Sequence, residues 1–474
     1  MKTGRIQNVI IFSLVVLTFF QTGELWFGGT PNHNFFYSFF SAGANGSDMA
    51  SLPDLTKPYR IAASVEQGRY KIKYSGISAS EQKKTLDDAV TTLFAKGTYV
   101  GQSAMDWSVL SKSLLFEYHC AVPTDAFSAA YRQKAGLLTT RFAAFDRILL
   151  VPGNTAYEPA SVLFHDAAAD QCHTFRIDQS DLNQTIKAAR EKLSVADNRL
   201  YYTASSSLSA LPVNLFSKHV FVPMWDDAAL SYADIEKINP YADGGFVLSY
   251  TVGDNINMFF NNPGRKQYTL INDVLTFSDE TTVVKYHQSN ILECNNYRTA
   301  DTDKPTTFAT AFNQAVEFIK LDTTIGAENE YYLADYYEDT GEWHLFFDFT
   351  VNDFPVFLSN RAGSTPELTH AIEITVSDGI VTKYMRSAYL YKTREQSTAV
   401  AVATEKGIDA LNTAIDNYLV PEEEDGAADF PPELIQSIEL GYNSDSADTV
   451  SLCWHIGYTE TTRKSTFPAT SPES

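Results

Sequence analysis

Cysteine, positive charge and short catalytic motifs are all scarce in this sequence. Four cysteines among 474 residues are too few for a scaffold built from disulfides. The 36 basic residues are outnumbered by 58 acidic ones, and the net charge of −22 predicts repulsion from nucleic acid and from anionic lipid headgroups. No G-x-S-x-G elbow, Walker loop or dinucleotide fingerprint occurs. These absences argue against nucleic-acid binding and against the enzyme classes that those motifs mark.

Long apolar runs are also scarce, and the clearest one lies at the N-terminus. Val9–Phe20 reads VIIFSLVVLTFF and carries no charge. As a helix, residues 6–27 would span roughly 30 Å, which matches the hydrocarbon core of a bilayer. Lys2 and Arg5 precede this segment, so the positive-inside rule predicts a cytoplasmic N-terminus. We therefore predict a single-pass protein of the cell membrane whose bulk is extracytoplasmic.

The same run could instead be the apolar region of a cleavable signal peptide. No A-x-A-like site follows Phe20 closely, and Ala42-Gly43-Ala44 lies too far downstream. Trp26 and Phe27 are typical of interfacial anchors. An uncleaved signal anchor is the favoured interpretation.

One stripe of this predicted helix combines apolar and hydrogen-bonding side chains. At about 100° per residue, the stripe comprises Gln7, Ile11, Leu14, Thr18, Gln21 and Leu25. Polar side chains on such a stripe can bond to a neighbouring helix in lipid, at about 1 kcal/mol each. We predict a partner-binding stripe here. The alternative stays open that Gln7 and Gln21 lie at the two membrane interfaces while Thr18 bonds its own backbone.

The sequence that follows the predicted anchor indicates an α+β fold of antiparallel sheets with packed helices, divided into several domains. The predicted organisation is a cytoplasmic tail at 1–5, the anchor at 6–27, a linker at 28–57, an N-terminal α+β domain at 58–200, a middle β-rich domain at 201–300, a C-terminal α+β domain at 301–462 and a disordered tail at 463–474.

The N-terminal domain shows clear periodicities. Tyr59–Val65 and Tyr70–Tyr74 alternate around Gly68 and predict a β-hairpin. Apolar residues of Ser80–Lys96 recur with a helical period that ends at Gly97. Further patterns predict strands and a second helix, namely Leu114–Cys120, Phe145–Val151, Ser161–Phe164, Cys172–Ile177 and the helix Ser180–Leu193.

The later regions predict two more groups of elements. The middle one comprises a helix around Ala229–Ile238 and a meander of strands at Phe246–Thr251, Ile256–Phe260, Tyr268–Ile271, Val274–Phe277 and Thr282–Tyr286. The C-terminal one comprises a helix that Thr306 and Thr307 can cap, strands at Tyr331–Tyr337, Trp343–Val351, Pro355–Leu358, Ala371–Val376 and Ile380–Leu390, a helix at Ala399–Leu419, and strands at Ile435–Tyr442 and Val450–Tyr458. Pairs such as Asn272-Asp273 and Asp378-Gly379 mark turns between strands.

The densest group of carboxylates consists of Asp335, Glu338, Asp339, Glu342, Asp348 and Asp353. Acid/base hydrolysis of a glycoside would need two carboxyls held roughly 5–9 Å apart in a cleft. Asp339 and Glu342 flank a turn glycine and Asp353 lies in a second predicted turn, so solvated turn residues explain the group better. We predict no catalytic residues.

Histidine and cysteine recur at His119-Cys120, His165 and Cys172-His173, which could suggest zinc. Adjacent strand residues point to opposite faces, so each pair could offer only one ligand, and no C-x-x-C spacing occurs. We predict no metal or cofactor. Cys120 and Cys172 could form a disulfide, although buried free thiols explain them equally well.

Several long segments resemble the YycH/YycI family, accessory membrane proteins of the WalK–WalR two-component system of Gram-positive bacteria. These segments are NVIIFSLVVLTFFQTGELW, MFFNNPGRKQYTLINDVLTFSD, WHLFFDFTVNDFPVFLSN, AIEITVSDGIVTKYMRSAYLY and IQSIELGYNSDSADTVSLCWHIGY. The resemblance is clearest to YycH, and the region 301–462 would be the YycI-like domain. It implies a non-catalytic regulator that contacts a WalK-like sensor histidine kinase and a YycI-like partner through its transmembrane helix and ectodomain.

The sequence thus predicts a non-enzymatic, membrane-anchored regulator of a cell-wall-linked sensor kinase. Two alternatives stay open. One is an envelope-associated binding module for wall polymer or peptide, and the weaker one is an extracytoplasmic hydrolase.

Overall fold

A computed structural model describes residues 52–66, 69–74, 80–133, 136–155, 158–195, 200–203, 216–217, 220–223, 229–232, 235–243, 246–247, 249–298, 306–326, 329–352, 354–358, 366–393, 400–403, 435–444, 450–458 and 464–468. The predicted cytoplasmic tail and membrane anchor lie outside these residues, as does most of the linker and of the helix predicted at Ala399–Leu419. Within the described ranges, no helix has the length and apolar character needed to cross a bilayer.

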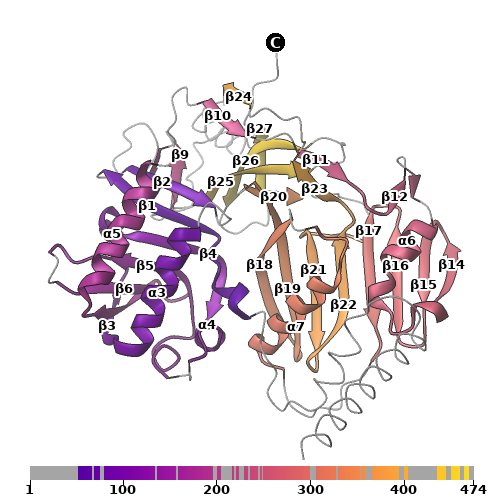
Figure 1. Ribbon diagram of the computed structural model, residues 1–474, viewed down its shortest axis with the longest axis horizontal. Helices are drawn as coiled ribbons and strands as arrows, with labels where there is room; N and C mark the ends of the chain where they lie inside the picture. Colours follow the sequence, from indigo (N-terminus) through magenta and orange to yellow (C-terminus); the bar gives the residue numbers. More distant parts are fainter. Residues whose placement is uncertain are drawn as a thin grey trace, which may run out of the picture. The chain divides into compact units, whose positions relative to one another are not determined.

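Two large and mostly antiparallel sheets form the described chain, and both have helices packed against them (Figure 1). This arrangement confirms the α+β class. The first sheet has nine strands in the order β3 (Thr98–Ala104), β7 (Gln171–Ile177), β6 (Ala160–Asp166), β5 (Ala144–Val151), β4 (Leu114–Pro123), β1 (Arg60–Glu66), β2 (Arg69–Tyr74), β8 (Tyr201–Thr203) and β9 (Phe221–Pro223).

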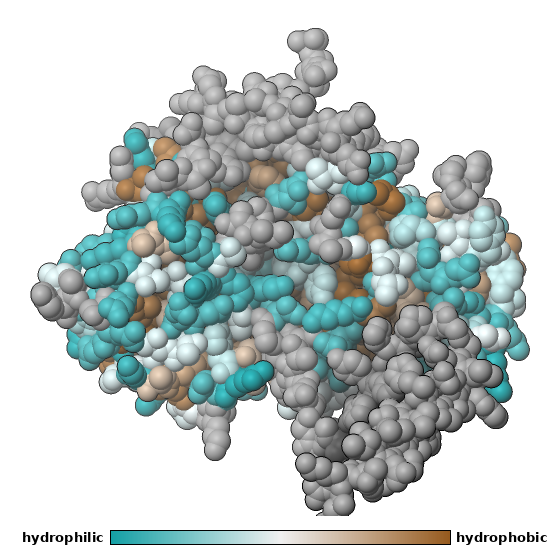
Figure 2. All heavy atoms as spheres, in the orientation of Figure 1, coloured by the Kyte–Doolittle hydropathy of each residue, from teal (hydrophilic) through white to brown (hydrophobic). Residues whose placement is uncertain are grey.

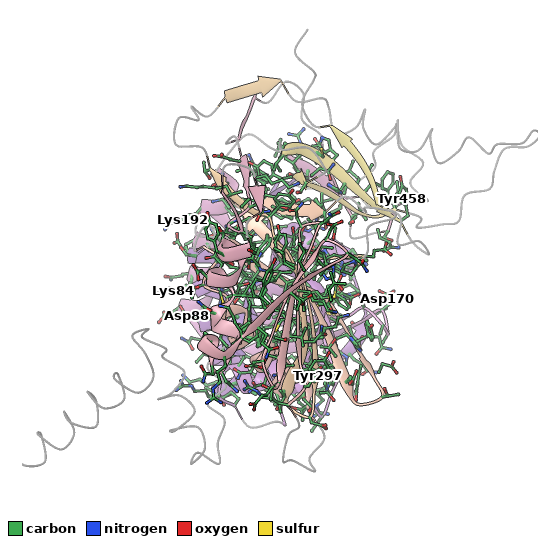
Figure 3. All side chains as sticks on the ribbon, turned by 90° about the vertical axis from the view of Figure 1, so that its right-hand side faces the viewer. Lys84, Asp88, Asp170, Lys192, Tyr297 and Tyr458 are labelled. Atoms are coloured by element: carbon green, nitrogen blue, oxygen red, sulfur yellow. The ribbon has the colours of Figure 1, made fainter. Side chains whose placement is uncertain are left out.

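Two helices, α3 (Ser80–Lys96) and α5 (Ser180–Val195), pack against each other and against this sheet. On α3, Leu86, Val90 and Leu93 of the predicted helical stripe are buried, while Phe94 is partly buried. The outer surface of the helices is mostly hydrophilic (Figure 2), and Lys84, Asp88 and Lys192 project from it (Figure 3). A shorter helix, α4 (Thr124–Ala130), follows β4 directly. The predicted hairpin is β1–β2, and the predicted strands 114–177 correspond to β4 to β7.

The second sheet has twelve strands. Its order is β14 (Gln267–Ile271), β15 (Val274–Ser278), β16 (Thr282–His287), β17 (Ile291–Asn296), β22 (Ile380–Ser387), β21 (Ile372–Ser377), β19 (Glu342–Val351), β20 (Phe354–Leu358), β25 (Ile435–Ser444), β26 (Ser451–Tyr458) and β27 (Lys464–Pro468), with β18 (Glu330–Asp339) paired to β19. Only the β20–β25 pairing within this sheet is parallel. Smaller two-stranded sheets pair β10 (Ala229–Tyr232) with β24 (Val400–Ala403), β11 (Ile235–Ile238) with β23 (Leu390–Thr393), and β12 (Ala242–Asp243) with β13 (Phe246–Val247).

Helix α7 (Phe308–Leu321) covers one face of the second sheet, where it packs on β19, β21 and β22. The Thr307 side chain accepts a hydrogen bond from the backbone N–H of Thr310, which confirms the predicted cap. Phe312 and Val316 of α7 are buried, and the Phe312 ring contacts that of Phe347 on β19. The face of the sheet that carries Phe347 is therefore the one that α7 covers.

The predicted turns are confirmed by their backbone angles. Asn272 and Asp273 both have positive φ, and so do Asp378 and Gly379. Each pair joins two neighbouring strands with no intervening residue. Two consecutive positive φ angles are characteristic of the turn type that matches the right-handed twist of hairpin strands.

Two predictions in the middle region are wrong, and a third is right only in part. The helix expected around Ala229–Ile238 is replaced by β10 and β11, because each of these short segments pairs with a strand more than 150 residues later. The strand expected at Ile256–Phe260 is instead a 3₁₀ turn after α6 (Ser249–Asn255). Helix α6 also replaces the second half of the strand expected at Phe246–Thr251, of which only Phe246–Val247 forms a strand, β13. Val252, Ile256 and Phe260 are buried at four-residue spacing, which is a helical period. The prediction had instead interpreted this segment as the alternating pattern of a strand.

Two further differences lie near the C-terminus. The helix predicted from Ala399 begins as the strand β24, because Val400–Ala403 pairs with β10. Within the tail whose composition predicts disorder, Lys464–Pro468 forms β27 and pairs with β26. Both strands depend on a partner that composition does not reveal.

Strand pairing also crosses the predicted domain boundaries at residues 200 and 300, since β8 pairs with β2 and β17 pairs with β22. The domain boundaries themselves stay predictions.

Candidate binding groove

The predicted partner-binding stripe of Gln7, Ile11, Leu14, Thr18, Gln21 and Leu25 lies outside the described residues, so it stays a prediction. The candidate surface described below is formed by strands of the second sheet.

The carboxylate group between Asp335 and Asp353 contains both exposed and buried side chains. Asp335, Glu338 and Asp339 lie exposed on β18, in keeping with solvated residues at or near a turn. Asp348 is buried and accepts hydrogen bonds from the backbone N–H of Ala371 at 2.9 Å. Its other oxygen lies 3.0 Å from His370 Nδ1. Asp348 is thus held in place by the two residues that precede β21, while Asp353 lies outside the described residues.

The histidines considered above as zinc ligands each contact a different group of the protein. His119 Nδ1 lies 2.8 Å from the carbonyl oxygen of Ala334, and His165 Nδ1 lies 2.7 Å from Asp146. Cys120 and Cys172 are both free thiols. Burial raises the pKa of Cys172 to about 11, so this thiol stays protonated at neutral pH. No group of potential metal ligands forms within the part of the chain that the structure describes.

The more notable surface is the face of the second sheet opposite α7. Strand alternation places Leu345 and Phe347 of β19 toward the core, so His344 and Phe346 point to the other face. The strand registers align one row of side chains across this face, namely Tyr337, His344, Thr375, Lys383 and Asn295 from β18, β19, β21, β22 and β17. A neighbouring row contains Phe346, Glu373 and Met385.

These two rows form the floor of an open groove of about 610 Å³. Its lining also includes Tyr297 and Glu342. Met385 packs into a small buried cluster with Ile291 and Leu368. The floor of the groove thus combines buried Met385 with partly exposed aromatic and polar side chains.

Aromatic rings give the groove flat, partly exposed surfaces. The Tyr337 ring stacks on His344 with centroids 4.5 Å apart and on Phe346 at 5.7 Å. Tyr337 is 50% exposed and Tyr297, labelled in Figure 3, is 67% exposed. Exposed tyrosines offer a large contact area with little loss of side-chain entropy, and they are enriched at recognition surfaces.

Charged and amide groups surround these rings. One carboxylate oxygen of Glu373 accepts hydrogen bonds from Thr369, both from its backbone N–H at 2.7 Å and from its hydroxyl at 2.9 Å. Lys383 is exposed in the same groove. An arrangement of aromatic surface with separate donors and acceptors suits recognition of an extended polar partner.

Sequence reasoning missed Tyr297 and Lys383 as site residues. A usable signal existed on β19, where alternation puts His344 and Phe346 on the face opposite the core residues. Nothing in the sequence showed that β17 and β22 would be neighbours, and that pairing brings Asn295 beside Lys383.

Comparison with known proteins supports the fold. No protein-family model matches the chain, and no curated protein matches it in sequence. Among solved structures, the chain is similar to the crystal structure of YycH from Bacillus subtilis, with a TM-score of 0.53 and 12% sequence identity. The similarity covers 89% of this chain and 97% of that one. The YycH-like fold that the sequence resemblance implies is therefore confirmed.

Proposed function

We propose that this chain is a non-catalytic, membrane-anchored regulator of a cell-wall-linked sensor histidine kinase. The observation that carries the proposal is the YycH-like fold, which extends over 89% of the chain. The sequence resemblance to the same family also supports it.

The mechanism follows from differential binding. A regulator shifts a kinase only if it binds one signalling state better than the other. The groove of the second sheet is the proposed ectodomain contact, and the stripe from Gln7 to Leu25 is the proposed contact within the membrane. A YycI-like protein is the second proposed partner.

Site-specific photo-crosslinking tests the partner. A photoreactive amino acid replaces Tyr297 in the groove, and a control chain carries it at Lys84, which is exposed on α3 of the other sheet. Crosslinking is carried out in intact membranes, and the products are identified by mass spectrometry. We expect a sensor histidine kinase from position 297 and much less from position 84. Absence of any kinase from both positions would contradict the proposal.

A functional assay tests the regulation itself. The captured kinase is reconstituted in proteoliposomes with and without the full chain, and its autophosphorylation rate is measured. We expect the chain to change this rate and a Tyr337→Ala/Lys383→Glu variant to lose most of the effect. The control Lys84→Glu should keep it. An identical rate with and without the native chain would count against regulation.

A binding module for wall polymer or peptide is the second candidate, and the aromatic floor of the groove is the observation that favours it. Retention of the chain on insoluble cell wall, lost in Tyr337→Ala, would support this candidate. Turnover of a wall substrate that disappears on Glu373→Gln would instead favour the extracytoplasmic hydrolase.

A further inference from the structure

Among the described residues, no strand pairs with the outer edge of β14 in the second sheet. Strand β14 is the terminal strand of that sheet, and it pairs with β15 on one side only (Figure 1). All five of its residues, Gln267–Ile271, are exposed. Tyr268, Leu270 and Ile271 are 47%, 56% and 62% exposed, which is high for large apolar side chains. Such an edge is a ready template for another strand.

The other edge strands of the two large sheets carry features that discourage pairing. Strand β3 contains a bulge between Tyr99 and Gly101, and β9 has three residues and ends at Pro223. Strand β18 is bulged and carries several carboxylates. In contrast, β14 has a regular register and no charged residue. Bulges, prolines and charges are the usual protections of an edge, and β14 has none of them.

The turn at Asn272-Asp273 determines which backbone groups point outward. In a two-residue hairpin the flanking pair, here Ile271 and Val274, exchanges both hydrogen bonds. Alternation then directs the backbone N–H and C=O of Thr269 toward β15. The same groups of Tyr268 and Leu270 point away from the sheet.

We propose that β14 pairs antiparallel with β14 of a second copy of this chain, with Thr269 on the two-fold axis. This register places Tyr268 of each copy opposite Leu270 of the other. Because both residues direct their N–H and C=O outward, each pair can exchange two hydrogen bonds. No shift of the register or change in the strand is needed.

Side chains and charges fit the same two-fold arrangement. Tyr268 and Leu270 lie on one face of β14, where Tyr268 already contacts the Phe277 ring with centroids 5.2 Å apart. Pairing would bring these apolar side chains of both copies together. The basic end of the strand, with exposed Arg265, would lie beside the end of the second copy that carries exposed Asp273. A second copy is therefore the occupant that satisfies hydrogen bonds, apolar surface and charge together.

Cysteine crosslinking tests the register. Opposed residues in a non-hydrogen-bonded antiparallel pair have Cα atoms about 4.5 Å apart, which lies within the range that a disulfide bridges. The full-length Thr269→Cys variant, held in mild detergent and oxidised gently, should give a disulfide-linked dimer. Val100→Cys, on the exposed edge strand β3, is the matched control and should give no disulfide-linked dimer, as should the parent chain. Equal crosslinking of the two variants, or none at position 269, would overturn the proposal.

Charge pairing provides a second test that does not depend on oxidation. Thr269→Lys and Thr269→Glu each place like charges on the two-fold axis, so each variant alone should be monomeric by light scattering. Their equimolar mixture should recover the dimer. Leu270→Pro removes an outward N–H that a single copy leaves unpaired, so it should abolish the dimer while the circular dichroism spectrum stays unchanged. Dimers that persist in every variant, or a different protein crosslinked through position 269, would refute self-pairing.

Discussion

The phenolic hydroxyl of Tyr59 donates a hydrogen bond of 3.1 Å to the carboxylate of Glu439, although 380 positions separate the two residues. Nearby, the Tyr74 hydroxyl accepts the backbone N–H of Leu440 at 3.1 Å. Burial raises the pKa of Tyr59 well above its ordinary value, so its hydroxyl remains a donor throughout the usual pH range. These bonds connect the start of the first sheet to strand β25 of the second.

Replacement of Tyr59 by phenylalanine should destabilise the protein. The change removes the hydroxyl and leaves the buried Glu439 carboxylate without this donor. Hydrogen bonds to charged groups contribute roughly 1.5–3 kcal/mol, so the free energy of unfolding should fall by about that amount. Urea denaturation followed by circular dichroism measures it. Tyr337→Phe, at a half-exposed position, is the control and should change stability by less than about 0.5 kcal/mol. Equal effects of the two variants would contradict the role assigned to Tyr59.

Loss of Arg386 should have a larger effect. Its guanidinium Nε lies 2.7 Å from the Asp322 carboxylate, and both side chains are completely buried. Removal of one partner leaves an uncompensated buried charge, so Arg386→Met should cost roughly 3–5 kcal/mol in denaturant unfolding. The control Lys192→Met breaks an exposed pair with Glu81 and should cost at most about 1 kcal/mol. When Asp322→Leu is added to Arg386→Met, we expect the double variant to be more stable than Arg386→Met alone. A double variant that is less stable would show that the Asp322 charge is not what destabilises Arg386→Met.

The Glu293 carboxylate should contribute to stability in a pH-dependent way. Hydrogen bonding to His287 is the largest cause that lowers its pKa, which falls from 4.5 to about 2 despite partial burial. Because the folded-state pKa is the lower one, ionised Glu293 stabilises the fold fully above about pH 4.5, and this contribution is lost as the pH falls toward 2. Glu293→Gln should therefore flatten the acid side of the stability curve in this window. If the free energies of unfolding of Glu293→Gln and of the wild type differ by the same amount at pH 5 and at pH 2.5, Glu293 is not responsible for the loss of stability in acid.

The stripe predicted from Gln7 to Leu25 gives a test of the proposed membrane anchor. Thr18→Leu combined with Gln21→Leu removes two polar side chains, each worth about 1 kcal/mol in helix association. The double variant should co-purify with less of the partner kinase from detergent extracts. Phe20→Leu, which lies off the stripe, should co-purify like the native chain. Equal recovery of the kinase with the double variant would remove the hypothesis that this stripe binds a partner.

Local signals predicted the elements that carry their own pattern. Ser80–Lys96 has a helical stripe and a terminal glycine, and the helix occupies the predicted residues. Thr307 caps α7 because its hydroxyl can reach an unpaired N–H within the same turn. Segments whose conformation depends on a distant partner were predicted badly. Ala229–Ile238 and Val400–Ala403 read as helical, yet β10 and β24 are strands because they pair with each other.

The sequence by itself determined the α+β class, the turns with positive φ and the positions of most strands, because periodicity and turn chemistry act within a few residues. Only the tertiary structure decided which strands are neighbours, and hence that Tyr337, Thr375, Lys383 and Asn295 share one groove. It also decided that β14 forms an open edge. Pairing between strands depends on the burial of whole sheet faces, which is a property of the folded chain rather than of any short segment.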